Sequence, residues 1–108
     1  MPLPTPEEIG PAPVCQGAAQ CAAMWAEVEP ALRAATGRRI QSRQVDAIET
    51  TDFTEAGLLH GRAWRRPLPQ GGYEIIGEFR CGRPACAINE ARALQRFQRQ
   101  VREAGAGH

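Results

Sequence analysis

The stretch Tyr73-Glu74-Ile75-Ile76-Gly77-Glu78-Phe79-Arg80-Cys81 decides the fold of this chain. Its odd positions hold apolar or small residues, and most of its even positions hold charged ones. This two-residue period is typical of a strand with one buried face. We therefore predict a strand over residues 73–81 whose odd-numbered side chains face the core.

Two further strands are predicted upstream of this one. Leu58 to Arg66 forms the first partner, and the turn-rich segment 67–72 joins it to the strand over 73–81 as a hairpin. Residues 39–51 lose any helical period and gain β-branched residues, so they are predicted to form one more strand.

Helices are predicted on both sides of the strands. From Gly17 to Ala35 apolar residues recur at three- and four-residue steps, and Gly37 follows as a natural stop. Pro30 lies inside this helix and should bend it over residues 26–30. The second helix runs from Ala87 to Glu103. Its buried side is expected to consist of Ile88, Ala91, Leu94, Phe97 and Val101.

The predicted fold class is α+β, in the order α-β-β-β-α. Three antiparallel strands that carry both helices on one face are the simplest packing of these elements. The length of 108 residues suits a single domain. We expect a Pro-rich flexible tether over residues 1–14, one domain over 15–104 and a frayed tail over 105–108.

The net charge is too small for the molecule as a whole to attract DNA, RNA or an acidic membrane. Thirteen basic residues, all of them arginine, face twelve acidic ones, which gives a net charge of +1. No nucleic-acid partner is therefore expected, and the basic stripe on the last helix is interpreted as a solvated face. This stripe consists of Arg92, Arg96, Arg99 and Arg102. No apolar run approaches the roughly 20 residues that span a bilayer, so no transmembrane segment is expected.

The four cysteines fall into two local pairs, Cys15 with Cys21 and Cys81 with Cys86. This arrangement suits two short-range disulfides in an oxidising compartment, although spacing alone does not choose among the three connectivities. One alternative is a zinc ion held by all four thiolates in a reducing cytosol, for which the first pair is spaced too widely. Unpaired thiols are a further alternative.

The first residues contain neither a charged region nor an apolar one, so we expect no signal peptide in this chain. The protein is then either cytosolic, or exported with its signal segment absent from this chain. A Pro-rich tether could separate a lipid anchor or signal from the folded domain.

The sequence holds no catalytic constellation. It contains two histidines, His60 and His108, and no motif for a nucleophile, a metal or a bound phosphate. We therefore expect no enzyme activity, no cofactor and no metal site. Glu74 and Glu78 share one strand face, either as a carboxylate pair or, as we prefer, as cross-strand partners of Arg62 or Arg66.

One candidate binding surface alternates along the second predicted strand. It consists of His60, Arg62, Trp64 and Arg66. On an uncovered sheet these side chains could recognise an anionic or aromatic ligand, a glycan, a partner protein or the bases of a single strand. The competing interpretation is that Trp64 packs under a helix, or is shielded by the stems of its arginine neighbours.

The cysteine placement also carries a resemblance. The pair Cys15 and Cys21 is followed by Met24-Trp25, and Cys81 and Cys86 precede the closing helix. Together with Thr36-Gly37, the stretch from Ile40-Gln41 to Ala47-Ile48-Glu49-Thr50, and Gly71-Gly72-Tyr73, this resembles small uncharacterised exported proteobacterial proteins, periplasmic or lipoprotein-like. The resemblance covers residues 15–101. It implies an envelope location and two disulfides, and it implies no activity.

Three hypotheses follow. The first is an exported envelope protein with a binding or structural role, whose partner is an unknown protein or small ligand. The second is a cytosolic interaction or regulatory domain with reduced or zinc-bound cysteines, and the third and weakest is an enzyme. A free sheet face or edge would also favour a homodimer.

Overall fold

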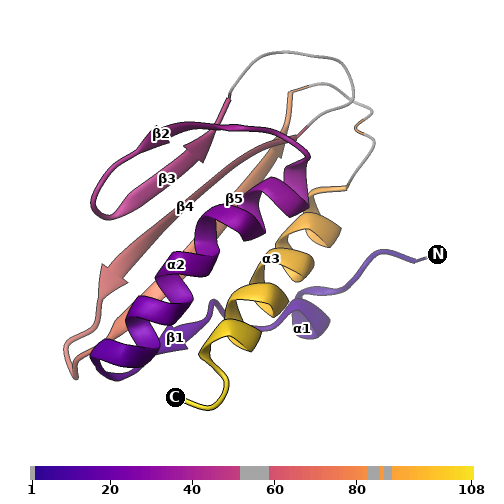
Figure 1. Cartoon of the computed structure of the whole chain (residues 1–108). Helices are drawn as coiled ribbons and strands as arrows, with labels where there is room; N and C mark the ends of the chain where they lie inside the picture. The colour runs from indigo at the N-terminus through magenta and orange to yellow at the C-terminus, as the bar shows by residue number, and fades with distance from the viewer. Residues whose placement is uncertain (1, 52–58, 83–85, 87–88) are drawn as a thin grey trace.

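The computed structural model describes residues 2–51, 59–82, 86 and 89–108. Within these residues the fold is α+β, with an antiparallel sheet and helices packed on it (Figure 1). The elements are α1 (Pro6–Ile9), β1 (Val14–Cys15), α2 (Gly17–Thr36), β2 (Ile40–Arg43), β3 (Ala47–Thr50), β4 (Leu59–Pro67), β5 (Tyr73–Cys81) and α3 (Glu90–Gly105).

The sheet has the strand order β1-β5-β4-β3-β2, and every neighbouring pair is antiparallel. The β4–β5 hairpin is its longest part, with register from Leu59 opposite Cys81 to Pro67 opposite Tyr73. The strand predicted over residues 73–81 is confirmed with these bounds. Ile75 and Phe79 are only 1% and 6% exposed, as their odd positions predict. The predicted start of β4 at Leu58 lies outside the described residues.

The prediction of one strand over residues 39–51 is wrong, because this segment folds back into the β2–β3 hairpin. The N–H of Gln44 donates to the carbonyl of Ala47 at 2.8 Å and closes the turn. Val45, one of the β-branched residues that favoured a strand, lies at the tip of the turn and is 78% exposed. Arg65 holds this turn through the Asp46 carboxylate at 2.9 Å and the Val45 carbonyl at 3.1 Å.

Strand β1 is the other addition to the predicted sheet. Its two residues pair with Tyr73 and Glu74 of β5, and the Ile75 N–H donates to the Pro13 carbonyl at 2.8 Å. Two residues within a Pro-rich stretch are too few to show a strand period. The described part of the chain therefore has five strands where the sequence predicted three.

The first long helix, α2, confirms the helix predicted from Gly17, while the bend expected over residues 26–30 stays a prediction. It runs unbroken through Pro30 and ends at Thr36. Gly37 adopts the left-handed conformation, with φ of 73°, and its N–H donates to the Arg33 carbonyl at 2.8 Å. This is the helix termination that glycine favours.

The last helix, α3, begins after Asn89, whose side chain accepts a hydrogen bond from the Ala91 N–H at 2.7 Å. The predicted first residues, Ala87 and Ile88, lie outside the described residues. Of the expected inward stripe, Phe97 and Val101 are buried, and Leu94 is only partly buried.

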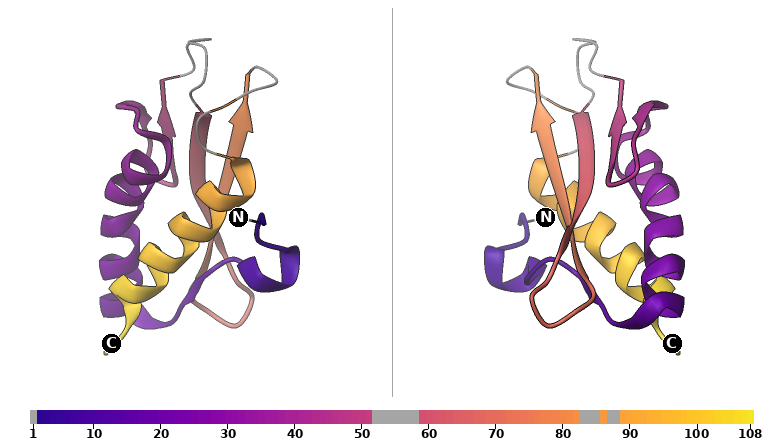
Figure 2. Two further views of the ribbon diagram at one scale, coloured as in Figure 1. Left: turned by 90° about the vertical axis from the view of Figure 1, so that its right-hand side faces the viewer. Right: turned by 90° about the vertical axis from the view of Figure 1, so that its left-hand side faces the viewer.

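Helices α2 and α3 pack against each other on the same face of the sheet, as predicted (Figure 2). Among the described residues the largest fully buried side chain is that of Phe97, which packs edge to face with Phe79 with ring centroids 5.6 Å apart. Gly77 lies directly beneath Phe97, because a Cβ at Gly77 would stand 2.7 Å from that ring. The lack of a side chain on β5 therefore lets the helix approach the sheet.

The N-terminal segment, predicted as a Pro-rich flexible tether, includes the short helix α1 and contacts α3. Thr5 and Glu8 form a capping box that starts α1, with hydrogen bonds of 3.2 and 3.1 Å. The side-chain amide of Gln98 on α3 then donates to three successive carbonyls, those of Ile9, Gly10 and Pro11, at 3.0 to 3.2 Å. Arg102, from the predicted solvated stripe, also donates to the Pro11 carbonyl.

All four cysteines are paired, Cys15 with Cys21 and Cys81 with Cys86, with Cα atoms 5.0 and 6.0 Å apart. The two pairs lie at opposite ends of β5, since Cys15 is opposite Tyr73 and Cys81 ends the strand. Eight residue steps of about 3.3 Å separate these ends by about 26 Å. The four sulfurs therefore cannot share one zinc ion.

We expect the double substitution Cys81→Ser/Cys86→Ser to lower the free energy of unfolding by about 2 kcal/mol, the chain-entropy value for so short a loop. Urea denaturation measures this loss, and far-ultraviolet circular dichroism should show an unchanged fold class. The matched variant Cys15→Ser/Cys21→Ser removes a loop of nearly the same length, with sequence separation 6 instead of 5, and should lose a similar amount. An unchanged midpoint would show that the Cys81–Cys86 bond does not stabilise the domain.

A pH dependence follows from the ion pair between Arg43 on β2 and Glu29 on α2, which has two hydrogen bonds of 2.7 and 2.9 Å. The hydrogen bond from Arg43 is the main cause that lowers the pKa of Glu29 from its ordinary value of 4.5. Because the folded pKa lies below the unfolded one, this stabilisation is present above pH 4.5 and is lost as the pH falls through the folded value.

We therefore expect the wild type to be more stable than Glu29→Gln at pH 7, and the difference to shrink steadily below pH 4.5. Urea denaturation of both proteins between pH 7 and pH 3 measures it. A difference that stays constant over this range would contradict the assignment.

Candidate functional site

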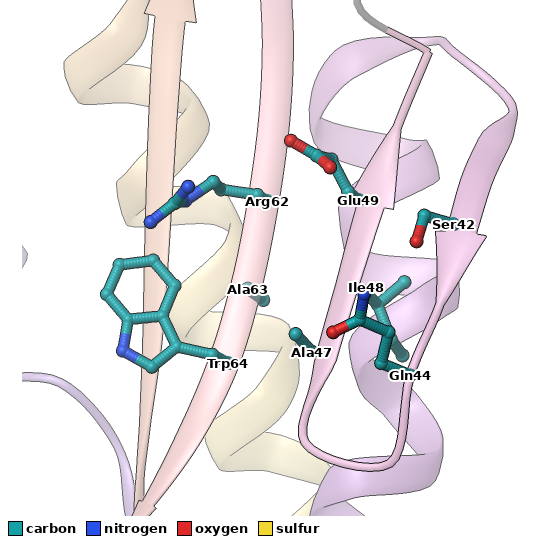
Figure 3. A pocket seen from close by; sticks show the side chains of 8 residues that line it. All are labelled: Ser42, Gln44, Ala47, Ile48, Glu49, Arg62, Ala63 and Trp64. Carbon is teal, nitrogen blue, oxygen red and sulfur yellow. The ribbon is translucent and has the colours of Figure 1, made fainter.

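One face of the sheet carries neither of the two long helices. We call it the open face. Figure 3 looks onto it, with the helices behind the strands. Because side chains alternate along a strand, it receives the even-numbered residues of β4 and β5 and the odd-numbered residues of β3. Its members are Ala47, Glu49, His60, Arg62, Trp64, Arg66, Glu74, Ile76, Glu78 and Arg80.

The four residues of the predicted surface, His60, Arg62, Trp64 and Arg66, all lie on this face. Trp64 does not pack under a helix. Figure 3 shows its indole ring face-on, over β5, with the guanidinium of Arg62 beside it. The guanidinium carbon lies 4.8 Å from the ring centroid, so Arg62 shields part of the indole by a cation–π contact.

The arginines of the open face all contact glutamates on the same face. Arg62 lies opposite Glu78 at 3.4 Å, and Arg66 lies opposite Glu74 and contacts its carboxylate. These are the two cross-strand pairs that the sequence predicted. Arg80 shares Glu78 at 3.4 Å. Glu49 is the remaining acidic residue on the open face. The described part of this face therefore carries three arginines and three glutamates, and their charges balance.

Glu49 contacts a histidine instead of an arginine. Its Oε2 lies 3.0 Å from Nε2 of His60, on the neighbouring strand. The His60 Nδ1 atom is 3.4 Å from the Thr51 carbonyl. These contacts fix the imidazole and the carboxylate at one end of the open face.

A hollow of about 350 Å³ opens on this face between β4 and the β2–β3 hairpin (Figure 3). Ala47 lies opposite Trp64 in the sheet, and its small side chain leaves the room that forms the hollow. The lining residues are Ser42, Gln44, Ala47, Ile48, Glu49, Arg62, Ala63 and Trp64. The hollow is thus bounded by β4, which carries Arg62 and Trp64, on one side and by polar side chains of the β2–β3 hairpin on the other.

Several polar groups of the hollow are unused. The Ser42 hydroxyl, the Gln44 side-chain amide and the Trp64 indole N–H make no hydrogen bond to any residue, as far as the described ranges show. These groups offer both donors and acceptors to a bound molecule. A shallow site of this composition is suited to recognition.

The described residues of this face provide no cluster for a metal ion and no free thiol. No group of three His, Cys, Asp or Glu side chains there could hold a metal ion, and all four cysteines are in disulfides. Glu74 and Glu78 are each engaged by arginine.

The sequence reasoning missed the half of the hollow that comes from β2 and β3. The segment predicted as one strand contains Ser42, Gln44, Ala47 and Glu49. That prediction did not say which residues of the sheet these four would lie beside. The signal that could have revealed this strand is the two-residue alternation over Ala47–Thr50. Ile48 and Thr50 are buried, and Ala47 and Glu49 are only partly buried.

Arg65 lies on the opposite face of β4 and helps to position the hollow. Its guanidinium carbon is 4.7 Å from the Trp25 ring centroid and 5.1 Å from that of Tyr73. The same side chain binds Asp46 in the β2–β3 turn at 2.9 Å. Gln44 is therefore carried by a turn that is attached to the helix side of the sheet.

Comparison with known proteins adds no assignment. No protein-family model matches this sequence, and no similar chain was found among curated proteins or solved structures. Within the described residues, none of the helices combines the length and apolar character that crossing a membrane requires.

Proposed function

We propose that this protein is a binding module of the cell envelope and that its ligand docks on the open face of the sheet. The observation that carries the proposal is the hollow beside Trp64, with its unused polar groups. An aromatic side chain with a few convergent polar groups is the usual composition of a ligand site.

The envelope location is supported by the two disulfides, because such bonds persist in oxidising compartments and are rare in a reducing cytosol. The resemblance to small exported proteins points the same way. The cytosolic alternative would need both pairs to be reduced, and a zinc ion shared by all four cysteines is incompatible with their separation along β5.

The compartment is tested by intact mass under denaturing, non-reducing conditions after thiol blocking, on protein recovered from the cells that produce it naturally. We expect no blocked thiol and a mass lower by four hydrogens, as two disulfides require. Four blocked thiols would place the protein in a reducing compartment and overturn the envelope assignment.

The binding surface is tested by nuclear magnetic resonance of the ¹⁵N-labelled chain. Small molecules, saccharides and proteins from an envelope extract are separated and added one fraction at a time. We expect the amide shifts to cluster in β3, β4 and the β2–β3 turn. Shifts confined to α2 and α3, or no shifts with any fraction, would overturn the open face as the binding surface.

A further inference from the structure

The hollow on the open face has a composition that narrows the class of its ligand. Its aromatic element is the indole of Trp64, which is partly exposed, lies over β5 in Figure 3 and is covered by the Arg62 guanidinium over only part of its ring. A flat apolar surface of this kind buries the face of another ring and leaves the edges of that ring free for polar contacts.

The rim of the hollow supplies donors and acceptors in close alternation. Ser42 and Gln44 each offer both, and the Trp64 N–H is a donor. Glu49 adds an acceptor, since His60 engages only its Oε2 atom and no other contact of this carboxylate occurs within the described ranges. A ligand that carries several hydroxyl groups could use all of these at once, because each hydroxyl both donates and accepts.

The charge of the face selects against an anion. Arg62 is the arginine that lines the hollow, and it is already paired with Glu78 at 3.4 Å and stacked beside Trp64. With three arginines and three glutamates on the open face, no positive excess attracts a phosphate or an acidic polymer. An apolar aromatic ring by itself would use the indole and leave the polar rim unpaired, which costs affinity, whereas a sugar ring carries hydroxyls along its edge.

We infer that the open face binds a neutral oligosaccharide, with one sugar ring stacked on Trp64 over β5 and the hydroxyls of the adjoining sugar unit hydrogen-bonded in the hollow to Ser42, Gln44 and Glu49. This inference rests on the proposed function and names its ligand class. A volume of about 350 Å³ fits a short saccharide unit held at one point.

The test titrates the ¹⁵N-labelled chain with three neutral oligosaccharides, namely cellotetraose, chitotetraose and maltotetraose. We expect at least one of them to shift the indole N–H signal of Trp64 and the amides of the β2–β3 turn, and to leave the indole signal of Trp25 in place. The spectrum of Trp64→Ala assigns the two indole signals.

Three variants make the result specific. Trp64→Ala should weaken binding at least tenfold. Gln44→Ala, at an exposed turn position where folding is not at risk, should weaken it severalfold. Arg80→Ala is the matched control, because Arg80 is on the open face but does not line the hollow, and its affinity should stay within twofold of the wild type.

The outcomes separate this inference from the proposed function. Open-face shifts with protein fractions or with oligogalacturonate, but with none of the neutral sugars, would overturn the saccharide inference and leave the open face as the binding surface. Equal loss of affinity in Trp64→Ala and Arg80→Ala would also overturn it. If no fraction or sugar shifts the open face, both proposals fail.

Discussion

Phe97→Ala is expected to lower the free energy of unfolding by about 3–5 kcal/mol, the usual cost of removing a buried phenylalanine. Phe97 is 0% exposed and fills the space between α3 and the sheet, where it meets Phe79 edge to face at 5.6 Å. Domains of this size are stable by about 5–15 kcal/mol, so the loss removes a large share of the total. Urea denaturation followed by circular dichroism measures it.

Gly77 provides the internal control, because a Cβ at this position would stand 2.7 Å from the Phe97 ring. Gly77→Ala alone should cost about 1–3 kcal/mol by overpacking. In the Phe97→Ala background the clash is gone, so the second substitution should cost little, and the two effects should be far from additive. Strict additivity would mean that the ring does not rest on Gly77.

Gly72→Ala is the second large effect, with an expected loss of about 3 kcal/mol. Gly72 has φ of +79°, a conformation that costs an L-residue about 1–2 kcal/mol. A Cβ there would also overlap the carbonyl oxygen of Cys15, a backbone atom fixed by the β1–β5 pairing and the nearby disulfide. The Cys15 carbonyl cannot move away from this Cβ without separating β1 from β5.

Gly71→Ala is the matched control for this prediction. Gly71 has φ of +99°, and a Cβ there would meet no atom within 4 Å. It should therefore cost only the backbone strain, about 1–2 kcal/mol. Urea denaturation compares the two variants, and hydrogen exchange at Ile75, whose N–H donates to Pro13, should accelerate in Gly72→Ala alone. Equal losses in both variants would rule out the contact with Cys15.

The parts of the fold that were predicted correctly are those with a long periodic signal. The alternation over β5 and the helical stripe of α2 extend over enough residues for one period to dominate. The β2–β3 hairpin lacked this signal, because each strand has four residues and the turn between them holds Val45, which is a strand former by type. Arg65, which is distant in the sequence, donates a hydrogen bond to the Val45 carbonyl and so stabilises the turn at Val45.

The candidate site was half predictable for the same reason. His60, Arg62, Trp64 and Arg66 follow from the alternation of β4 alone. Ser42 and Gln44 reach the hollow only through the pairing of two strands in a hairpin, which no local pattern determines. The N-terminal segment gives a parallel case, since its attachment depends on Gln98 in the last helix.

The position of Arg65 has a consequence for how this surface can change over evolution. Its guanidinium lies among Trp25, Tyr73 and Asp46, on the opposite side of the sheet from the proposed ligand. A substitution at Trp25 or Tyr73 would therefore shift the turn that carries Gln44 and alter selectivity without exchanging a residue that touches the ligand. Related proteins could diverge in specificity while the residues lining the hollow stay the same.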